Sequence, residues 1–159
     1  MNERAEHPII RAATEVLVPS AEARCWFVDL ETHPERYQFE THAGFAFGAG
    51  DFGEIGARFQ TWEEFLGLTI NLHFELTETS DSHFRFRLIR PPLPIWGAFT
   101  IKERTGSSID LGLEVGGTSR AGEWFLRLPI VRPVVQQQIT SEIEHIKASM
   151  EALRDSAQV

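Results

Sequence analysis

The residues of this chain that could do chemistry are few and far apart. Four histidines could in principle gather around a metal ion: His42, His73, His83 and His145. A zinc site needs three or four ligands that converge on one point, and none of these histidines forms an HxxxH or HExxH motif. We therefore expect surface or partly satisfied histidines, with no metal and no cofactor.

Acid–base and nucleophilic catalysis find little support in the sequence. The serines cluster in turns and show no Ser-His-Asp order. A general acid or base needs a carboxylate or histidine inside a pocket that shifts its pKa. One pair of candidates is Arg58 and Gln60, which would face the interior only if their strand turned its other face inward. The other is the Glu63-Glu64 pair near a sheet edge. We interpret Glu63-Glu64 as an exposed turn, so the sequence assigns no catalytic residue.

The only cysteine, Cys25, lies beside Trp26 and Phe27 and has no CxxC partner. A free cysteine among large apolar residues is usually a small core residue, and we expect that role here. One cysteine cannot form an internal disulfide. The N-terminal residues also lack the apolar core of a signal peptide. Together these features predict a cytoplasmic protein.

Residues 48–53, GAGDFG, match the GxGxxG pattern of dinucleotide sites. Such a site needs the motif between a strand and a helix, so that the helix N-terminus meets the pyrophosphate. Here a strand-like segment, residues 57–62, follows instead. We interpret the motif as a turn, and the alternative is a glycine-rich flap at the mouth of a pocket.

The composition excludes several classes of function. The chain has 159 residues, and its 15 Lys and Arg against 23 Asp and Glu give a net charge of −8. That charge argues against a nucleic-acid partner, and no run of about 20 apolar residues predicts a membrane span. The length suits one domain, which we place at residues 10–155, between tails at 1–9 and 156–159. Twelve Phe and four Trp against one Tyr predict a dry interior.

The elements expected to position any site are mostly strands. Residues 11–18 form the first strand, and two short helices follow, one over residues 21–30 with Ser20 as N-cap and one started by Pro34. Alternating apolar residues then predict six strands, at residues 39–47, 57–62, 68–76, 83–87, 95–102 and 109–115. We expect the strands at residues 68–76 and 83–87 to pair with each other. The expected partners are Leu76–Phe84, Phe74–Phe86, Leu72–Leu88 and Glu75–Arg85, because that register places opposite charges next to each other.

The remainder of the chain is expected to be helical. From Pro133 onward, one apolar stripe recurs at spacings of three and four: Val135, Ile139, Ile143, Ile146, Met150 and Leu153. Pro129 and Pro133 precede it and predict a kink or a separate short helix.

A mismatch in surface area predicts a cavity. Consecutive strands joined by short turns form an antiparallel sheet, and a helix stripe only about 100° wide cannot cover the apolar face of seven strands. The sheet must curl around the helix, and the space between them need not fill. The expected lining is Phe45, Phe47, Phe59, Ile70, Leu72, Phe74, Phe84, Phe86, Leu88, Phe99, Ile101, Leu111, Leu113, Val135, Ile139 and Ile143, with packed core as the alternative. Trp96 and Trp124 are candidates for the rim.

The order of strand, two short helices, six strands and a long helix resembles the α+β helix-grip fold of the START/Bet v 1-like (SRPBCC) superfamily. Four segments match its pattern: residues 18–21 (VPSA), 56–59 (GARF), 97–101 (GAFTI) and the closing helix from Pro133. The polyketide cyclase/dehydrase-like branch is the most similar. The resemblance implies a hydrophobic ligand held between the sheet and the last helix.

Three functions stay open at this level. We favour a binding protein for a hydrophobic small molecule such as a lipid, quinone or polyketide-like compound. The alternatives are a polyketide cyclase or dehydratase-like enzyme, which a buried Arg, Glu or His with a strongly shifted pKa would indicate, and a ligand-free protein-interaction domain of the co-chaperone kind. A collapsed interior would indicate that last alternative.

Overall fold

The computed structural model describes residues 6–39, 42–51 and 53–158, apart from the side chains of residues 42, 43 and 49. Its strands are β1 (Ile10–Val16), β2 (His42–Ala49), β3 (Arg58–Phe65), β4 (Leu68–Thr79), β5 (His83–Arg90), β6 (Ile95–Thr105) and β7 (Ser108–Gly117). Its helices are α1 (Ser20–Val28), α2 (Arg120–Arg127) and α3 (Val131–Ala157), with single 3-10 turns η1 (Asp29–Glu31) and η2 (Pro34–Tyr37).

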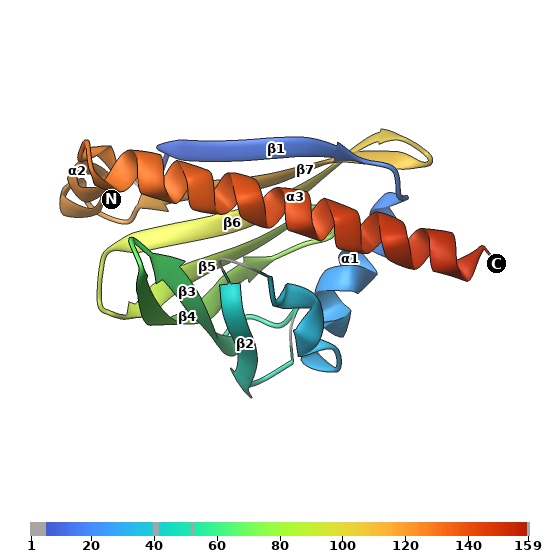
Figure 1. Cartoon of the computed structure of the whole chain (residues 1–159), viewed down its shortest axis with the longest axis horizontal. Helices are drawn as coiled ribbons and strands as arrows, with labels where there is room; N and C mark the ends of the chain where they lie inside the picture. Colours follow the sequence, from blue (N-terminus) through green and yellow to red (C-terminus); the bar gives the residue numbers. More distant parts are fainter. Residues whose placement is uncertain (1–5, 40–41, 52, 159) are drawn as a thin grey trace.

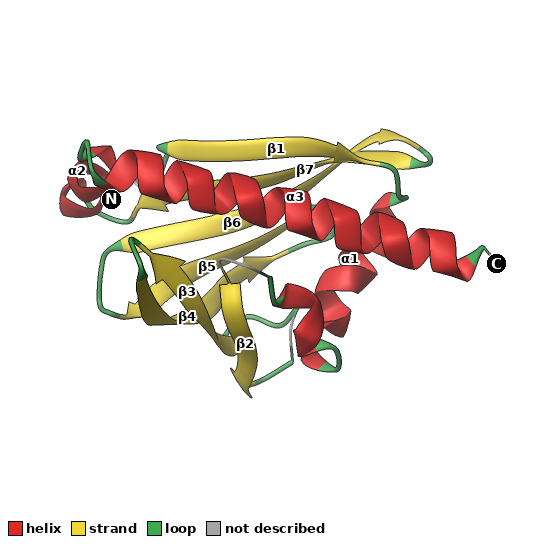
Figure 2. Ribbon diagram, viewed as in Figure 1, coloured by secondary structure: helices red, strands yellow, loops and turns green. Residues whose placement is uncertain are grey.

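The seven strands form one antiparallel sheet in the order β1-β7-β6-β5-β4-β3-β2. The sheet curls around α3, which runs beside β1 and β7 and above the middle strands (Figure 1). Helix α1 and the turns η1 and η2 lie next to β2, on the side of α3 that faces this strand. Helix α2 lies at the opposite end of the molecule (Figure 2). The α+β helix-grip architecture predicted from the sequence is confirmed.

The N-termini of the helices agree with the sequence-based expectations except at α1. Ser20 is the first residue of α1 and not its cap; Pro19 occupies the cap position and no side chain caps the helix. Pro34 opens η2 as predicted. The expected separate short helix before the long one is α2, whose first turn is capped by Ser119 Oγ accepting from the backbone N–H of Gly122.

The predicted register between β4 and β5 is wrong by two residues. Phe74 pairs with Leu88, Leu76 with Phe86 and Glu75 with Arg87. Apolar residues still oppose apolar residues in these pairs, as parity requires. The shift has a local cause, because β4 continues to Thr79, which pairs with Phe84. The irregularity between Leu76 and Glu78 then moves the register by one residue, which brings Leu76 opposite Phe86. Glu75 then accepts from Arg87 Nη2 at 3.0 Å and from Arg58 Nε at 3.2 Å.

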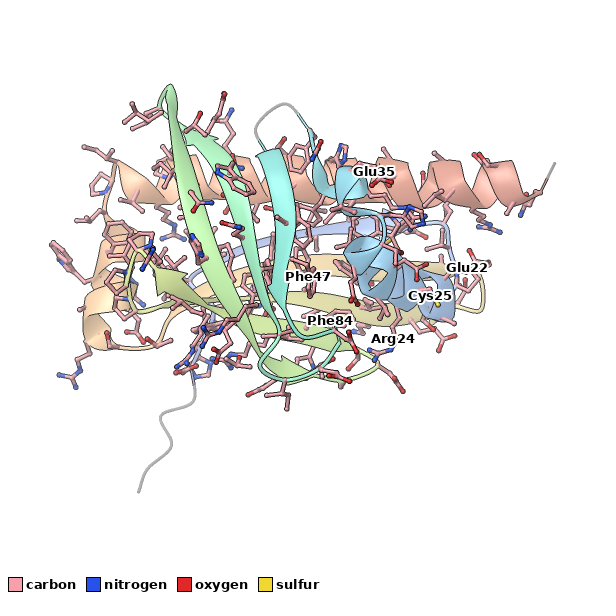
Figure 3. All side chains as sticks on the ribbon, turned by 90° about the horizontal axis from the view of Figure 1, so that it is seen from below. Glu22, Arg24, Cys25, Glu35, Phe47 and Phe84 are labelled. Carbon is pink, nitrogen blue, oxygen red and sulfur yellow. The ribbon has the colours of Figure 1, made fainter. Side chains whose placement is uncertain are left out.

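Cys25 is also placed wrongly by the sequence. It is exposed, because the buried face of α1 consists of Ala23, Trp26 and Phe27, and Cys25 lies off that face. Figure 3 shows Cys25 and Arg24 on α1 at the periphery of the molecule. The thiol therefore takes no part in the core.

Candidate functional site

A cavity of about 350 Å³ lies between the sheet and the N-terminal half of α3. Its wall is almost wholly apolar, and strands β2 to β7 and helices α1, α2 and α3 all contribute to it. The expected lining residues that border it are Phe45, Phe59, Ile70, Leu72, Phe74, Phe86, Leu88, Phe99, Leu113, Val135 and Ile139. That any of them contacts a ligand stays a prediction.

The other expected lining residues lie outside this wall: Phe47, Phe84, Ile101, Leu111 and Ile143. Phe84, Leu111 and Ile143 are at most 1% exposed, because α1 and the C-terminal half of α3 pack directly on this part of the sheet. The Phe84 ring, for example, lies 5.2 Å from that of Phe27 on α1, and Figure 3 shows it next to that helix. Alternation identifies the inner face of the sheet but not which part of that face is covered.

Exposed apolar side chains border one end of the cavity. Leu66, in the turn between β3 and β4, is 77% exposed, and Ile130, between α2 and α3, is 73% exposed. Trp96 borders the cavity but is buried, with Arg85 stacked 4.1 Å from its ring centroid. Trp124 is exposed on α2 and is not part of the wall. Of the two rim candidates, only Trp96 therefore reaches the cavity.

Five polar residues interrupt the apolar wall: Tyr37, Thr61, Glu63, Gln138 and Glu142. The interpretation of Glu63 as part of an exposed turn is wrong. Strand β3 continues to Phe65, so Glu63 shares the inner face with Phe59 and Thr61 and is buried. Thr61 Oγ1 donates to Glu63 Oε1 at 2.9 Å.

The remaining acid–base candidates of the sequence lie away from the cavity. Arg58 is exposed and bonded to Glu75, and Gln60 accepts from Asn71 Nδ2 at 3.3 Å. Glu64 is exposed. Arg58 and Gln60 therefore lie on the outer face of β3, opposite to the face that carries Phe59 and Thr61.

Glu142 is an acid in the cavity wall whose pKa is raised. It is buried on α3, and the Tyr37 hydroxyl donates to its Oε1. Burial raises the pKa of Glu142 to about 8, because an apolar environment disfavours the charged carboxylate. At neutral pH this side chain is a carboxylic acid, which can donate a hydrogen bond as well as accept one.

Sequence reasoning missed Tyr37, Gln138 and Glu142. Gln138 and Glu142 are four residues apart and lie beside Ile139 and Ile143 of the apolar stripe. Two polar residues at helical spacing next to such a stripe were the available signal. Tyr37 gave a signal of its own, since the single tyrosine among many phenylalanines needs a partner for its hydroxyl when it is buried.

The histidines and the glycine motif do not extend this site. His73 bonds Asn71 at 2.6 Å, His83 bonds Ser80 at 2.8 Å, and His145 Nε2 lies 3.1 Å from the carbonyl oxygen of Arg36; the side chain of His42 is outside the described residues. Within the described chain, no three His, Cys, Asp or Glu side chains gather as a metal site would need. The glycine motif spans the end of β2 and the loop before β3; Phe52 falls outside the described residues.

Comparison with known proteins identifies the fold. No family model matches the sequence, and no curated protein does. Solved structures do match over nearly the whole chain. An aromatase/cyclase from a Streptomyces species superposes with a TM-score of 0.71 at 9% identity, covering 89% of this chain and 92% of its own. The chain has the START/Bet v 1-like fold.

Two further structures with this START/Bet v 1-like fold come from other organisms. A START superfamily protein from Mycobacterium smegmatis has a TM-score of 0.63 at 14% identity and covers 93% of this chain and 97% of its own. A norcoclaurine synthase from Thalictrum, solved with a transition-state analogue, has a TM-score of 0.64 at 9% identity, covering 96% and 99%. At these identities the likeness shows the fold and not the activity. Among the described helices, none is long and apolar enough to cross a membrane.

Proposed function

We propose that this protein binds a hydrophobic small molecule in the cavity between the sheet and α3. The observation that carries the proposal is the cavity itself, about 350 Å³ of space walled almost entirely by apolar side chains. Ligand sites are typically concave, mostly apolar and supplied with a few placed polar groups. A ligand-free interaction domain would instead be expected to have a filled interior.

The size of the cavity limits the ligand. Its volume of about 350 Å³ lies at the lower end of the range of about 300–1,000 Å³ that is usual for ligand pockets, which favours a small molecule. The exposed Leu66 and Ile130 at one end would let part of a longer molecule stay in contact with apolar surface. Lipid, quinone and polyketide-like molecules all offer an apolar portion of this size.

Native mass spectrometry of the purified protein tests the proposal. We expect a co-purified apolar compound, or uptake of an added one such as a short-chain quinone. Val135→Trp should abolish uptake by filling the cavity, whereas Val28→Trp on α1, outside the wall, should leave it intact. Uptake unchanged in V135W, with V135W folded by circular dichroism, would contradict the proposal.

A second function, acid–base catalysis on a polyketide-like chain, is favoured by one observation. Glu142 is a buried acid whose pKa is raised to about 8, and it points at the same cavity with Tyr37 beside it. A general acid works best when its pKa lies near the operating pH. The matching test is turnover of a poly-β-ketone thioester: an enzyme would lose its activity in E142Q, and a binding protein would show none in either form.

A further inference from the structure

Glu142 carries a hydrogen-bond donor that the described protein leaves without an acceptor. Tyr37 donates to Oε1 of Glu142, and no other hydrogen bond or ion pair of Glu142 occurs in residues 6–39, 42–51 and 53–158. The side chain is 7% exposed and borders the cavity. A neutral carboxyl group also holds an O–H, and buried donors generally find an acceptor. Since Glu142 borders the cavity, a ligand there can supply that acceptor.

The described wall of the cavity also offers no positive charge to an anion. Among the described residues that border it, none is Lys, Arg or His, and the two ionisable carboxyl groups are Glu63 and Glu142. A buried anionic ligand would stand near two carboxyl groups, with no Lys, Arg or His among the described lining residues to balance its charge, which is unfavourable. A fatty acid or other carboxylate is therefore a poor match for the cavity.

We propose that the ligand is an uncharged molecule whose apolar body fills the cavity and whose hydrogen-bond acceptor, such as a ketone oxygen, meets Glu142. This inference rests on the proposed function and names the class of ligand. It places the polar end of the ligand at α3 and η2, and its apolar end toward β4 and β5. The raised pKa of Glu142 supports it, since the donor exists only while the carboxyl is protonated.

The surroundings of Glu142 make the donor dependent on pH. The other titratable groups that border the cavity are Tyr37 from η2, which donates to Glu142, and Glu63 from β3. His145, on α3 itself, is turned away, stacked on Phe39 with centroids 4.3 Å apart and bonded to the carbonyl of Arg36. The walls from β4, β5, β6 and β7 and from α1 and α2 are apolar. Ionisation at alkaline pH should therefore remove the donor and weaken binding of the neutral ligand.

Three probes of one shape test this inference: acetonaphthone, isopropylnaphthalene and naphthoate, all substituted at the same ring carbon. Their affinities are measured by ligand-observed NMR for the wild type, Glu142→Gln and Glu142→Met. At pH 7 naphthoate should bind the wild type at least tenfold more weakly than acetonaphthone. The preference for acetonaphthone over isopropylnaphthalene should fall about three- to tenfold in E142M, the size of one net hydrogen bond, and persist in E142Q, whose amide also donates.

Changing the pH provides a second reading without a variant. At pH 9 the wild type should lose the preference for acetonaphthone, whereas E142Q should keep it. If the preference is the same in all three proteins and at both pH values, or if naphthoate binds as well as acetonaphthone, the inference is overturned while the proposed function stands. If none of the probes binds the wild type, both fail together.

Discussion

The two halves of α3 face the same sheet but meet it differently. Toward the C-terminus, Ile143, Ile146 and Met150 are almost fully buried against packed side chains of the core. Toward the N-terminus, Val135 and Ile139 face the cavity across from Ile70 and Leu72. The apolar stripe is continuous along both halves, so hydrophobicity alone does not determine whether a helix covers a packed core or a hollow.

The difference arises from the sheet. Strands β1 and β7 run beside α3, and α1 fills the space next to β6, so this end is filled from both sides. Strands β3, β4 and β5 of the curved sheet lie apart from the helix (Figure 1), and the β4 residues Ile70 and Leu72 keep part of their surface exposed. The fold therefore combines a packed end that supplies stability with a hollow end that offers a site.

The largest expected effect compares one substitution in each half. Ile146→Ala should lower the free energy of unfolding by about 4 kcal/mol, because a fully buried side chain leaves a new cavity. Ile139→Ala should cost clearly less, since its side chain already lacks neighbours on the cavity side. Urea unfolding of both variants measures the difference, and equal losses would mean that the hollow end is as tightly packed as the other.

The next effect concerns pH. The folded state holds the Glu142 proton up to a pKa of about 8, whereas the unfolded chain releases it near 4.5. Between these values the folded state binds more protons, so stability should fall as pH rises, by up to roughly 1.4 kcal/mol per pH unit. This stabilising contribution is fully present below pH 4.5 and is lost once the pH passes about 8.

Glu142→Gln provides the control for this prediction. Glutamine keeps a partner for Tyr37 and does not titrate, so the variant should be more stable than the wild type at pH 7, on the order of 2 kcal/mol. Denaturant titrations at a series of pH values measure both proteins. An identical decline in the two would show that Glu142 is not the group responsible.

A smaller effect is expected on the outer face of the sheet at the hollow end. Glu75 bonds both Arg58 and Arg87, and both arginines are largely exposed. Arg87→Ala should therefore cost under about 1 kcal/mol, and the loss should shrink further in high salt. A loss of several kcal/mol would indicate that the register of β4 and β5 depends on this ion pair.

The smallest effect is expected at the packed end. Cys25 is exposed on α1, so a maleimide should label it in the native protein at a rate close to that of a model thiol. The labelled protein should unfold at the same denaturant concentration as the unlabelled protein. Labelling that requires denaturant would restore the core role that the sequence predicts for this thiol.

Most of the fold was accessible from the sequence, because strand alternation and the apolar stripe of α3 are periodic signals. The failures occurred where periodicity is broken or interrupted. The continuation of β4 to Thr79 shifted the β4–β5 register, and the continuation of β3 past Trp62 placed Glu63 on the inner face. A local pattern cannot reveal either, since both depend on how long a strand continues to find a partner.

The candidate site was less accessible than the fold. Its apolar wall follows from the inner faces of the strands, but which end of that face stays uncovered depends on where α1 and α3 rest. The bond between Tyr37 and Glu142 joins residues 105 positions apart in the chain. Helical spacing could have indicated Glu142, but only the tertiary structure brings it to the single tyrosine.

Because the cavity beneath α3 can hold a compound, the thermal stability of this protein should depend on whether one is bound. A compound that binds only the folded chain stabilises it by about 2.7 kcal/mol when present at a hundred times its dissociation constant. For a chain of this length, that corresponds to a rise in melting temperature of roughly 5 to 10 °C. Thermal denaturation against a library of small neutral compounds would thus reveal candidate occupants through the melting temperature alone, with no assay of turnover.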